Sequence, residues 1–226
     1  SIRTSINLYS RYHLIAEKLL IRNSFIVFNS FNSLYAFMPQ FTRNNQLKLF
    51  VIYNGYKIVD YPKLNSCISK KEIKIGGLGR QSKEKNFVQL VMVFKNRIEK
   101  INSIKETQLI IQGSLGIQSG QIKQLIGSEN DKIVLKDASS DTEAFFNDID
   151  ILVIPSIYEG CPNVLFEAMI HKRICIISKG ANSDNFVING INGFVYDGTD
   201  EGLLRSIINV ISVLGTQEEN NIVNHA

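Results

Sequence analysis

The sequence predicts an α/β fold in which helices cover both faces of a parallel sheet, a doubly wound sheet of the Rossmann-like type. From residue 73 onward, short runs rich in isoleucine, leucine and valine alternate with segments of helical periodicity. Several runs contain few polar residues, as expected for strands that are buried on both faces of a parallel sheet. Strands separated by helices imply right-handed crossovers, so the alternation predicts the doubly wound arrangement.

The expected strands of this domain are short and rich in β-branched residues. They are residues 73–77, 108–113, 132–135, 151–155 and 174–178. In the first of the expected helices, apolar residues recur at spacings of three and four, which places them on one face. The expected helices are residues 87–101, 143–148, 163–172 and 201–214.

The first 60 residues follow a different pattern. Residues 9–22 predict an amphipathic helix, residues 25–28 a short strand, and residues 47–53 a second strand that ends in an Asn54-Gly55 turn. These elements are too few for a domain of their own. We expect them to be the end of an upstream domain, and the start of the chain at Ser1 agrees with a missing upstream portion.

The pattern divides the chain into four parts. We expect residues 1–48 to be the incomplete tail of an N-terminal domain, and residues 49–71 to be an interdomain linker with the first strand. Residues 72–215 form the expected Rossmann-like domain, and residues 216–226 are expected to be a frayed polar tail. Without a partner domain, the aromatic side chains near the start should be exposed. These are Phe25, Phe28, Phe31, Tyr35, Phe37 and Phe41.

The bulk composition argues against several classes of protein. Hydrophobic residues make up 44% of the chain, and 25 basic against 21 acidic residues give a net charge of +4. This mild excess does not indicate a nucleic-acid partner. The cysteine count, three, is odd and indicates free thiols in a reducing compartment. No apolar run reaches about 18 residues and no signal peptide is visible, so we expect a cytoplasmic protein.

Glycines and cations follow the first two strands expected in the main domain. Gly79 and Arg80 lie just beyond the first strand, and Lys85 follows five residues later at the start of a helix. An arginine fork and a helix N-terminus both favour phosphate oxygens, so this turn suits a diphosphate. Gly113 follows the second strand and allows a tight turn over a ligand. The alternatives are a solvated basic turn and an ordinary strand-to-helix turn.

A stronger candidate site follows the strand expected at residues 151–155. Gly160 and Pro162 shape a turn, and Pro162 or Asn163 begins a helix. Backbone amides in the first turn of a helix have no helical partner and can donate to phosphate or sugar oxygens. The amides expected to do so are those of Asn163, Val164 and Leu165.

Two acids flank the start of this helix. Glu159 lies in the preceding turn, and Glu167 lies just over one turn inside the helix. The helix is apolar almost all round, so a lone buried Glu167 requires a partner or a ligand. A carboxylate is a good acceptor from the adjacent hydroxyls of a ribose or a hexose. The alternative is that both acids are ordinary surface residues.

The sequence contains no convincing metal motif. Asp148-Ile149-Asp150 has the form Asp-x-Asp but runs into an apolar strand, and we interpret it as the end of a helix. The histidines are scattered and lack the spacing of metal ligands. We therefore expect neither a metal nor a cofactor.

These stretches, in this order and spacing, resemble the C-terminal domain of retaining GT-B glycosyltransferases of family 4. The family has two glutamates separated by seven residues, as Glu159 and Glu167 are here. The resemblance extends over about residues 51–214. Its further segments are Val51-Ile52-Tyr53-Asn54-Gly55, Gly79-Arg80 with Lys85, and residues 188–195.

The resemblance implies a role for each candidate residue. Arg80 and Lys85 would neutralise the diphosphate of a nucleotide-sugar, and Glu159 would contact hydroxyls of the transferred sugar. Glu167 would hold the ribose. Retention without a metal is the usual chemistry of the family. The remaining donor-binding positions would be Gly79, Gly113, Gly160, Pro162, Asn163, Val164 and Leu165.

The resemblance also implies a substrate class and partners. We expect transfer of a hexosyl group from a UDP-sugar to a saccharide or polyprenyl-linked acceptor, in bacterial surface polysaccharide synthesis. Peripheral association with the inner face of the plasma membrane agrees with the basic residues near the start of the chain. Two alternatives stay open: a sugar epimerase of the same fold, and a non-catalytic module that only binds a nucleotide-sugar.

Overall fold

A six-stranded parallel sheet forms the centre of the larger domain. The computed structural model describes residues 25–38, 48–56, 71–128 and 130–226. The strand order is β5-β4-β3-β6-β7-β8, and every neighbouring pair is parallel. The α/β doubly wound fold expected from the sequence is therefore confirmed. The strands are β3 (Glu72–Leu78), β4 (Glu106–Gln112), β5 (Ile133–Lys136), β6 (Ile151–Ile154), β7 (Ile174–Ser178) and β8 (Phe194–Tyr196).

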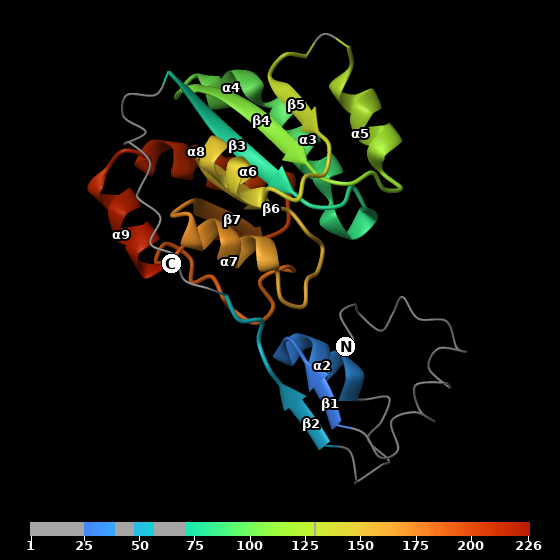
Figure 1. Cartoon of the computed structure of the whole chain (residues 1–226). Helices are drawn as coiled ribbons and strands as arrows, with labels where there is room; N and C mark the ends of the chain where they lie inside the picture. Colours follow the sequence, from blue (N-terminus) through green and yellow to red (C-terminus); the bar gives the residue numbers. More distant parts are fainter. Residues whose placement is uncertain (1–24, 39–47, 57–70, 129) are drawn as a thin grey trace.

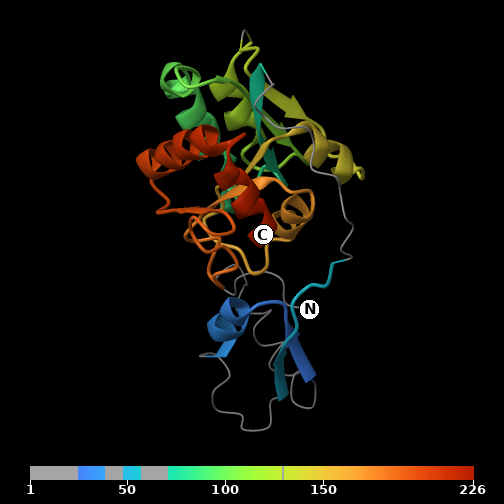
Figure 2. The same ribbon diagram turned by 90° about the vertical axis from the view of Figure 1, so that its left-hand side faces the viewer.

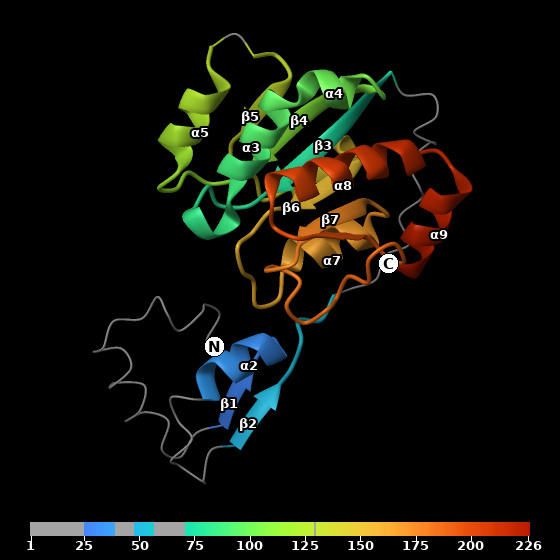
Figure 3. The same cartoon turned by 180° about the vertical axis from the view of Figure 1, so that it is seen from behind.

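Helices cover both faces of this sheet (Figures 1 and 3). Helices α6 (Thr142–Asp148) and α7 (Asn163–Ile170) cover one face. Figure 3 shows the opposite face, which carries the remaining helices of the domain. These are α3 (Phe87–Asn96), α4 (Ile98–Asn102), α5 (Ser119–Ile126), α8 (Asp200–Val213) and α9 (Gln217–His225).

Alternation along the strands divides the core into two clusters. In β6, Ile151 and Val153 pack on the side of α3 and α8, while Leu152 and Ile154 pack on the side of α6 and α7. Strand β7 alternates in the same way. Because successive side chains of a strand point to opposite faces, apolar runs without polar interruption are required here. This is the physical reason why the sequence pattern predicted the buried sheet.

Three elements depart from the expected pattern. The helix expected at residues 87–101 is two helices, α3 and α4, which are separated at Arg97. Strand β8 and helix α5 lie in segments for which only turns or no element were expected. Strand β8 has three residues, and α5 is rich in serine, glycine and glutamine, so neither leaves a strong periodic signal.

The C-terminal residues correct an expectation. Residues 216–226 were expected to be a frayed tail, but α9 is an ordered helix whose Ile222 and Val223 are buried in the core. The side chain of Thr216 caps the helix by accepting from the amide of Glu218, and Glu219 accepts from the amide of Gly215 at 2.5 Å. Burial of these two apolar residues and the cap at the helix start hold this otherwise polar segment against the domain.

A smaller piece precedes this domain. Strands β1 (Phe25–Phe28) and β2 (Lys48–Val51) form a parallel pair, with α2 (Phe31–Phe37) between them in the sequence. Figures 1, 2 and 3 all show this piece apart from the six-stranded sheet, beside the loops that follow β6 and β7. The strand expected at residues 25–28 is confirmed, and the strand expected at residues 47–53 is confirmed over residues 48–51. The helix expected at residues 9–22 lies outside the described residues.

The aromatic side chains of this piece are partly exposed, as expected. Phe25, Phe31 and Tyr35 are 66%, 46% and 63% exposed, whereas Phe28 is fully buried, which corrects its expected exposure. Phe28 faces inward because burial alternates along β1. The side chain of Phe37 and all of Phe41 lie outside the described residues. Within the described ranges, no helix combines the length and apolarity that crossing a bilayer requires.

Candidate functional site

The candidate site lies where the direction of strand succession reverses. The chain moves from β3 to β4 and β5 on one side, and then returns to β6, β7 and β8 on the other side of β3. The connections after β3 and β6 lead to helices on opposite faces, so their first loops diverge above the sheet. Ligands of open parallel sheets bind at this switch point, beyond the carboxyl ends of the strands.

The turns after β3 and β4 are packed against each other through Gly79 and Gly113. The amide of Gly79 donates to the carbonyl of Gln112 at 2.9 Å. Gly113 has a φ of +153°, and a Cβ atom at this position would lie 1.9 Å from the carbonyl oxygen of Gly79. The tight turn expected at Gly113 is therefore present, and it supports the loop that carries Arg80.

Lys85 and Glu159 join the turn after β3 to the turn after β6. The Nζ atom of Lys85 lies 2.6 Å from Oε1 of Glu159, with side-chain exposures of 25% and 15%. The hydroxyl of Ser156 donates to the same oxygen at 2.7 Å. The amide of Ile157 also donates to the carbonyl of Glu84 at 2.8 Å. A half-buried ion pair thus stands at the switch point, and Ser156 is a partner that the sequence analysis missed.

Arg80 has a different environment from Lys85. Its Nη2 atom lies 2.9 Å from Oε1 of Glu84, and its side chain is 62% exposed. Burial opposes ionisation of Glu84, but hydrogen bonds from Ser82, from the backbone of Glu84 and from Arg80 together lower its pKa. An exposed pair at this spacing contributes only about 0.3–0.5 kcal/mol. A phosphate group can therefore displace Glu84 from Arg80 at small cost.

The start of α7 offers two free amides rather than three. Pro162 is the N-cap residue, and the amide of Leu165 donates to the Pro162 carbonyl at 3.0 Å. A turn hydrogen bond therefore occupies the Leu165 amide, and a ligand role for this amide stays a prediction. The amides of Asn163 and Val164 have no hydrogen-bond partner within the described ranges. They lie at the positive end of the helix dipole.

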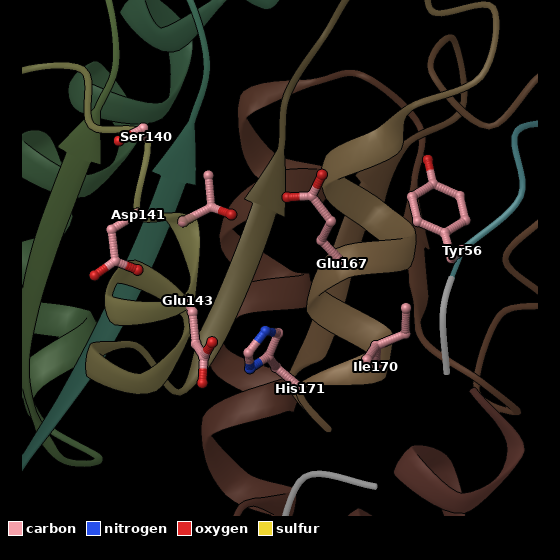
Figure 4. Close-up of a pocket in the computed structure, with 8 residues that line it drawn as sticks. Tyr56, Ser140, Asp141, Glu143, Glu167, Ile170 and His171 are labelled. Carbon is pink, nitrogen blue, oxygen red and sulfur yellow. The ribbon is translucent and has the colours of Figure 1, made fainter. Parts of the chain in front are cut away.

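Glu167 lines a separate cavity beside α7. The cavity has a volume of about 360 Å³ and extends along the groove between α6 and α7 (Figure 4). Glu167 projects into this groove from α7, and Asp141 and Glu143 lie across from it. The other lining residues are Tyr56, Ser140, Thr142, Ile170 and His171. Three carboxylates make the cavity unsuitable for a phosphate and suitable for a ligand that donates hydroxyl hydrogen bonds.

The structure thus gathers the predicted residues into two groups. Gly79, Gly113, Arg80, Lys85 and Glu159 belong to one connected set of turns at the switch point. Among the residues that the structure describes, no hydrogen bond or ion pair joins Glu167 to that set. It lies four residues beyond the first residue of α7, which corresponds to about 6 Å along a helix axis. Gly160 and Pro162 form the turn between the two groups, so one extended ligand could contact both.

The half-buried carboxyl group of Glu167 predicts a pH-dependent stability difference. Desolvation raises the pKa of Glu167, and within the described residues no hydrogen bond or ion pair offsets it. The folded state then holds this proton more tightly than the unfolded state, so the stability contribution is present at acid pH and is lost as pH rises through the raised pKa. We expect Glu167→Gln to raise the free energy of unfolding at pH 7, by less than about 1 kcal/mol because the group keeps part of its hydration.

Urea unfolding at pH 7 and at pH 4 tests this expectation. The gain of the Glu167→Gln variant should shrink at the acid pH, where the wild-type carboxyl group is also protonated. The exposed Glu99→Gln variant on α4 is the matched control. An equal gain at both pH values would contradict the assignment of the effect to desolvation.

Comparison with known proteins defines the class to which this site belongs. The sequence profile of the family described as Glycosyl transferases group 1 matches residues 72–212. The match covers more than half of the chain and includes every predicted site residue. The chain therefore belongs to the group 1 glycosyltransferases.

Individual relatives agree with this class. The chain is similar to the capsular polysaccharide biosynthesis glycosyltransferase CapM of Staphylococcus aureus, with 30% identity over 128 residues, which are 56% of this chain and 33% of CapM. The fold is similar to that of Anabaena Alr3699/HepE in complex with UDP and glucose, with a TM-score of 0.78, 24% identity, and coverage of 97% of this chain and 62% of that chain. TarM gives a TM-score of 0.69 at 22% identity, over 94% of this chain and 43% of that chain. The chain thus spans a third of the curated relative and 62% of the Anabaena structure.

Proposed function

We propose that this chain supplies the donor-binding half of an enzyme that transfers a hexosyl group from a UDP-sugar to a saccharide or lipid-linked acceptor. The observation that carries the proposal is the Lys85–Glu159 ion pair at the switch point, with Glu167 in the adjacent cavity. A nucleoside diphosphate sugar has the matching sequence of groups: a hydroxylated ribose, an anionic diphosphate and a hydroxylated sugar. Membership of the group 1 glycosyltransferases supports this choice of ligand.

In this proposal, the turn after β3 and the start of α7 bind the diphosphate. Lys85 and Arg80 provide two positive charges, and the amides of Asn163 and Val164 provide donors at the positive end of the helix dipole. These groups are in place before the glycosidic bond breaks, so they stabilise the charge that develops on the departing nucleoside diphosphate. In this proposal the two side-chain cations neutralise that charge, and no metal is invoked.

In this proposal, the cavity beside α7 binds the ribose. Glu167 accepts hydrogen bonds from adjacent ribose hydroxyls, and its neighbours Asp141 and Glu143 keep phosphate away from this end. Glu159 accepts from hydroxyls of the transferred sugar after Lys85 turns toward the diphosphate. Attack of the acceptor on the face from which the leaving group departs gives retention of the anomeric configuration.

The acceptor and the cellular setting are parts of the same proposal. CapM is named for capsular polysaccharide biosynthesis, and the Anabaena protein was solved with UDP and glucose. These names support a UDP-sugar donor and a role in surface polysaccharide synthesis. A polyprenyl-linked acceptor would bring the enzyme to the inner face of the plasma membrane as a peripheral protein of the cytoplasm.

A thermal-shift experiment with nucleoside diphosphates tests the donor proposal. UDP at 100 times its dissociation constant should stabilise the chain by about 2.7 kcal/mol. Glu167→Ala should reduce the affinity for UDP about 10- to 100-fold, because the ribose loses its charged acceptor. The shift should be smaller with GDP and ADP than with UDP.

The control separates ligand binding from folding. Glu99→Ala removes an exposed acid on α4 and should leave the UDP shift unchanged. Absence of a shift with UDP, GDP and ADP alike would refute the donor-binding function. A full-length enzyme that binds UDP-sugar but transfers nothing would instead support a non-catalytic binding module.

A further inference from the structure

The residues that follow β2 are attached to the start of α7. The side-chain amide of Asn54 donates to Oδ1 of Asn163 at 2.5 Å, and the hydroxyl of Tyr56 donates to the same oxygen at 2.7 Å. The ring of Tyr56 also packs against Phe166, with ring centroids 5.2 Å apart. Tyr56 therefore contacts both the first residue of α7 and the residue that immediately precedes Glu167.

A second tie lies on the other side of the same segment. The hydroxyl of Tyr53 donates to Oδ2 of Asp184 at 3.2 Å, and Asp184 also accepts from the amides of the first two residues of α2, at 2.7 and 2.9 Å. The neighbouring Ser183 donates to the backbone carbonyl of Glu159 at 3.3 Å. Residues 53–56 are therefore attached on both sides of the turn that runs from Glu159 to Asn163.

Tyr56 also belongs to the wall of the cavity that contains Glu167 (Figure 4). Burial raises the pKa of its hydroxyl to about 12, so the group stays a neutral donor at physiological pH. It can therefore hold Asn163 across the pH range in which a nucleotide-sugar is used. The hydroxyl is already bonded to Asn163, so its contribution to a ligand acts through α7.

We propose that Tyr56 is a positioning residue for the nucleotide: its hydroxyl holds the start of α7 through Asn163, and its ring holds the turn that carries Glu167 through Phe166. This inference rests on the proposed donor site at α7. In this proposal, linker residues 53–56 contribute to nucleotide binding. The free amides of α7 and the carboxylate of Glu167 keep their relative placement only while Tyr56 is bound to Asn163 and Phe166. By linkage, a nucleotide at α7 must also strengthen the docking of residues 53–56.

The Tyr56→Phe variant isolates the hydroxyl from the ring. Asn163 keeps the hydrogen bond from Asn54, so its oxygen is not left without a donor and the fold should be retained. Loss of one neutral hydrogen bond from a positioned group corresponds to about a 3- to 10-fold weaker affinity for UDP. Tyr56→Ala removes the ring contact as well and should weaken UDP binding by about 30-fold or more.

Isothermal titration of the full chain with UDP measures these changes. The matched control is Tyr35→Phe, because Tyr35 is 63% exposed on α2 and its hydroxyl makes no hydrogen bond within the described ranges. This control should bind UDP like the wild type. The melting temperature of each variant without ligand is measured in parallel, so that a loss of stability is distinguished from a loss of placement.

Amide hydrogen exchange provides a readout that a purely structural role would not change. Saturating UDP should slow exchange of the amides in residues 53–56 of the wild type, and this protection should be smaller in Tyr56→Phe, which keeps the ring contact and the hydrogen bond from Asn54. Equal UDP affinity of the wild type and Tyr56→Phe, with or without a lower melting temperature, would overturn the positioning role and leave the donor site standing. A wild-type chain that does not bind UDP would remove the donor site and this inference with it.

Discussion

Replacing Lys85 with methionine should reduce the affinity for UDP about 30- to 100-fold, one of the largest functional effects expected of a single substitution in this chain. Lys85 is the less exposed of the two cations at the switch point, and it is held 2.6 Å from Glu159 rather than in solvent. Low hydration strengthens its attraction to a diphosphate. The variant also leaves Glu159, which is 15% exposed, without its counter-charge. We therefore expect a loss of stability in addition to the loss of binding.

A double substitution separates these two effects. When Lys85→Met is combined with Glu159→Gln, both side chains are neutral, so no uncompensated charge is left near the switch point. The hydroxyl of Ser156 can still donate to the carbonyl oxygen of the new amide side chain. The melting temperature should recover toward that of the wild type, whereas UDP affinity should stay low. Lys123→Met, an exposed position on α5, is the matched control and should change neither quantity. Recovery of UDP affinity in the double variant would contradict a direct role of Lys85 in phosphate binding.

Among the substitutions proposed here for this chain, Gly113→Ala should cause the largest loss of stability. The added Cβ atom would lie 1.9 Å from the carbonyl oxygen of Gly79, and the φ of +153° is unfavourable for any residue with a side chain. The clash is with backbone, so a rotamer change cannot relieve it and the turns after β3 and β4 must separate. We expect destabilisation of about 3 kcal/mol or more. For a chain of this size, that corresponds to a melting temperature lower by about 6–12 °C.

Gly120→Ala is the matched control for this substitution. Gly120 lies in α5, and nothing lies within 4 Å of a Cβ atom placed there. The same chemical change should therefore stabilise the chain by about 0.5–1 kcal/mol, because alanine loses less backbone entropy in a helix. Differential scanning calorimetry of both variants measures the contrast. Similar melting temperatures for Gly113→Ala and the wild type would contradict the close packing of the two turns.

Burial on both faces is the reason that the sheet could be predicted from the sequence. A strand between two helical layers needs apolar residues at most positions, and the runs of residues 151–154 and 174–177 meet this requirement. The helix start at Asn163 was predictable because Pro162 cannot donate within a helix and fits its first turn. Strand β8 was not predictable, since only its alignment beside β7 makes three residues a strand.

The placement of the candidate residues at one edge of the sheet was predictable, but their pairings were not. The order of strands and helices shows which residues follow a strand end. Arg80, Lys85 and Glu159 each follow such an end, so they were expected at one edge of the sheet. The partner of each charge depends on side-chain reach across loops that are distant in sequence. Lys85 binds Glu159, 74 positions away, whereas Arg80 binds Glu84 in its own turn. The turn hydrogen bond that the Leu165 amide makes to Pro162 was likewise not visible in the sequence.

Sequence alone determined the class of fold, the edge of the sheet at which chemistry can occur, and the residue types available there, because periodicity and turn chemistry act over a few neighbouring positions. The tertiary structure decided which groups meet: the ion pair at the switch point, the separate cavity of Glu167, and the attachment of Tyr56 to α7. These contacts depend on the relative placement of segments that are far apart in the sequence, and hydrogen bonds form only when that placement is correct to a fraction of an ångström.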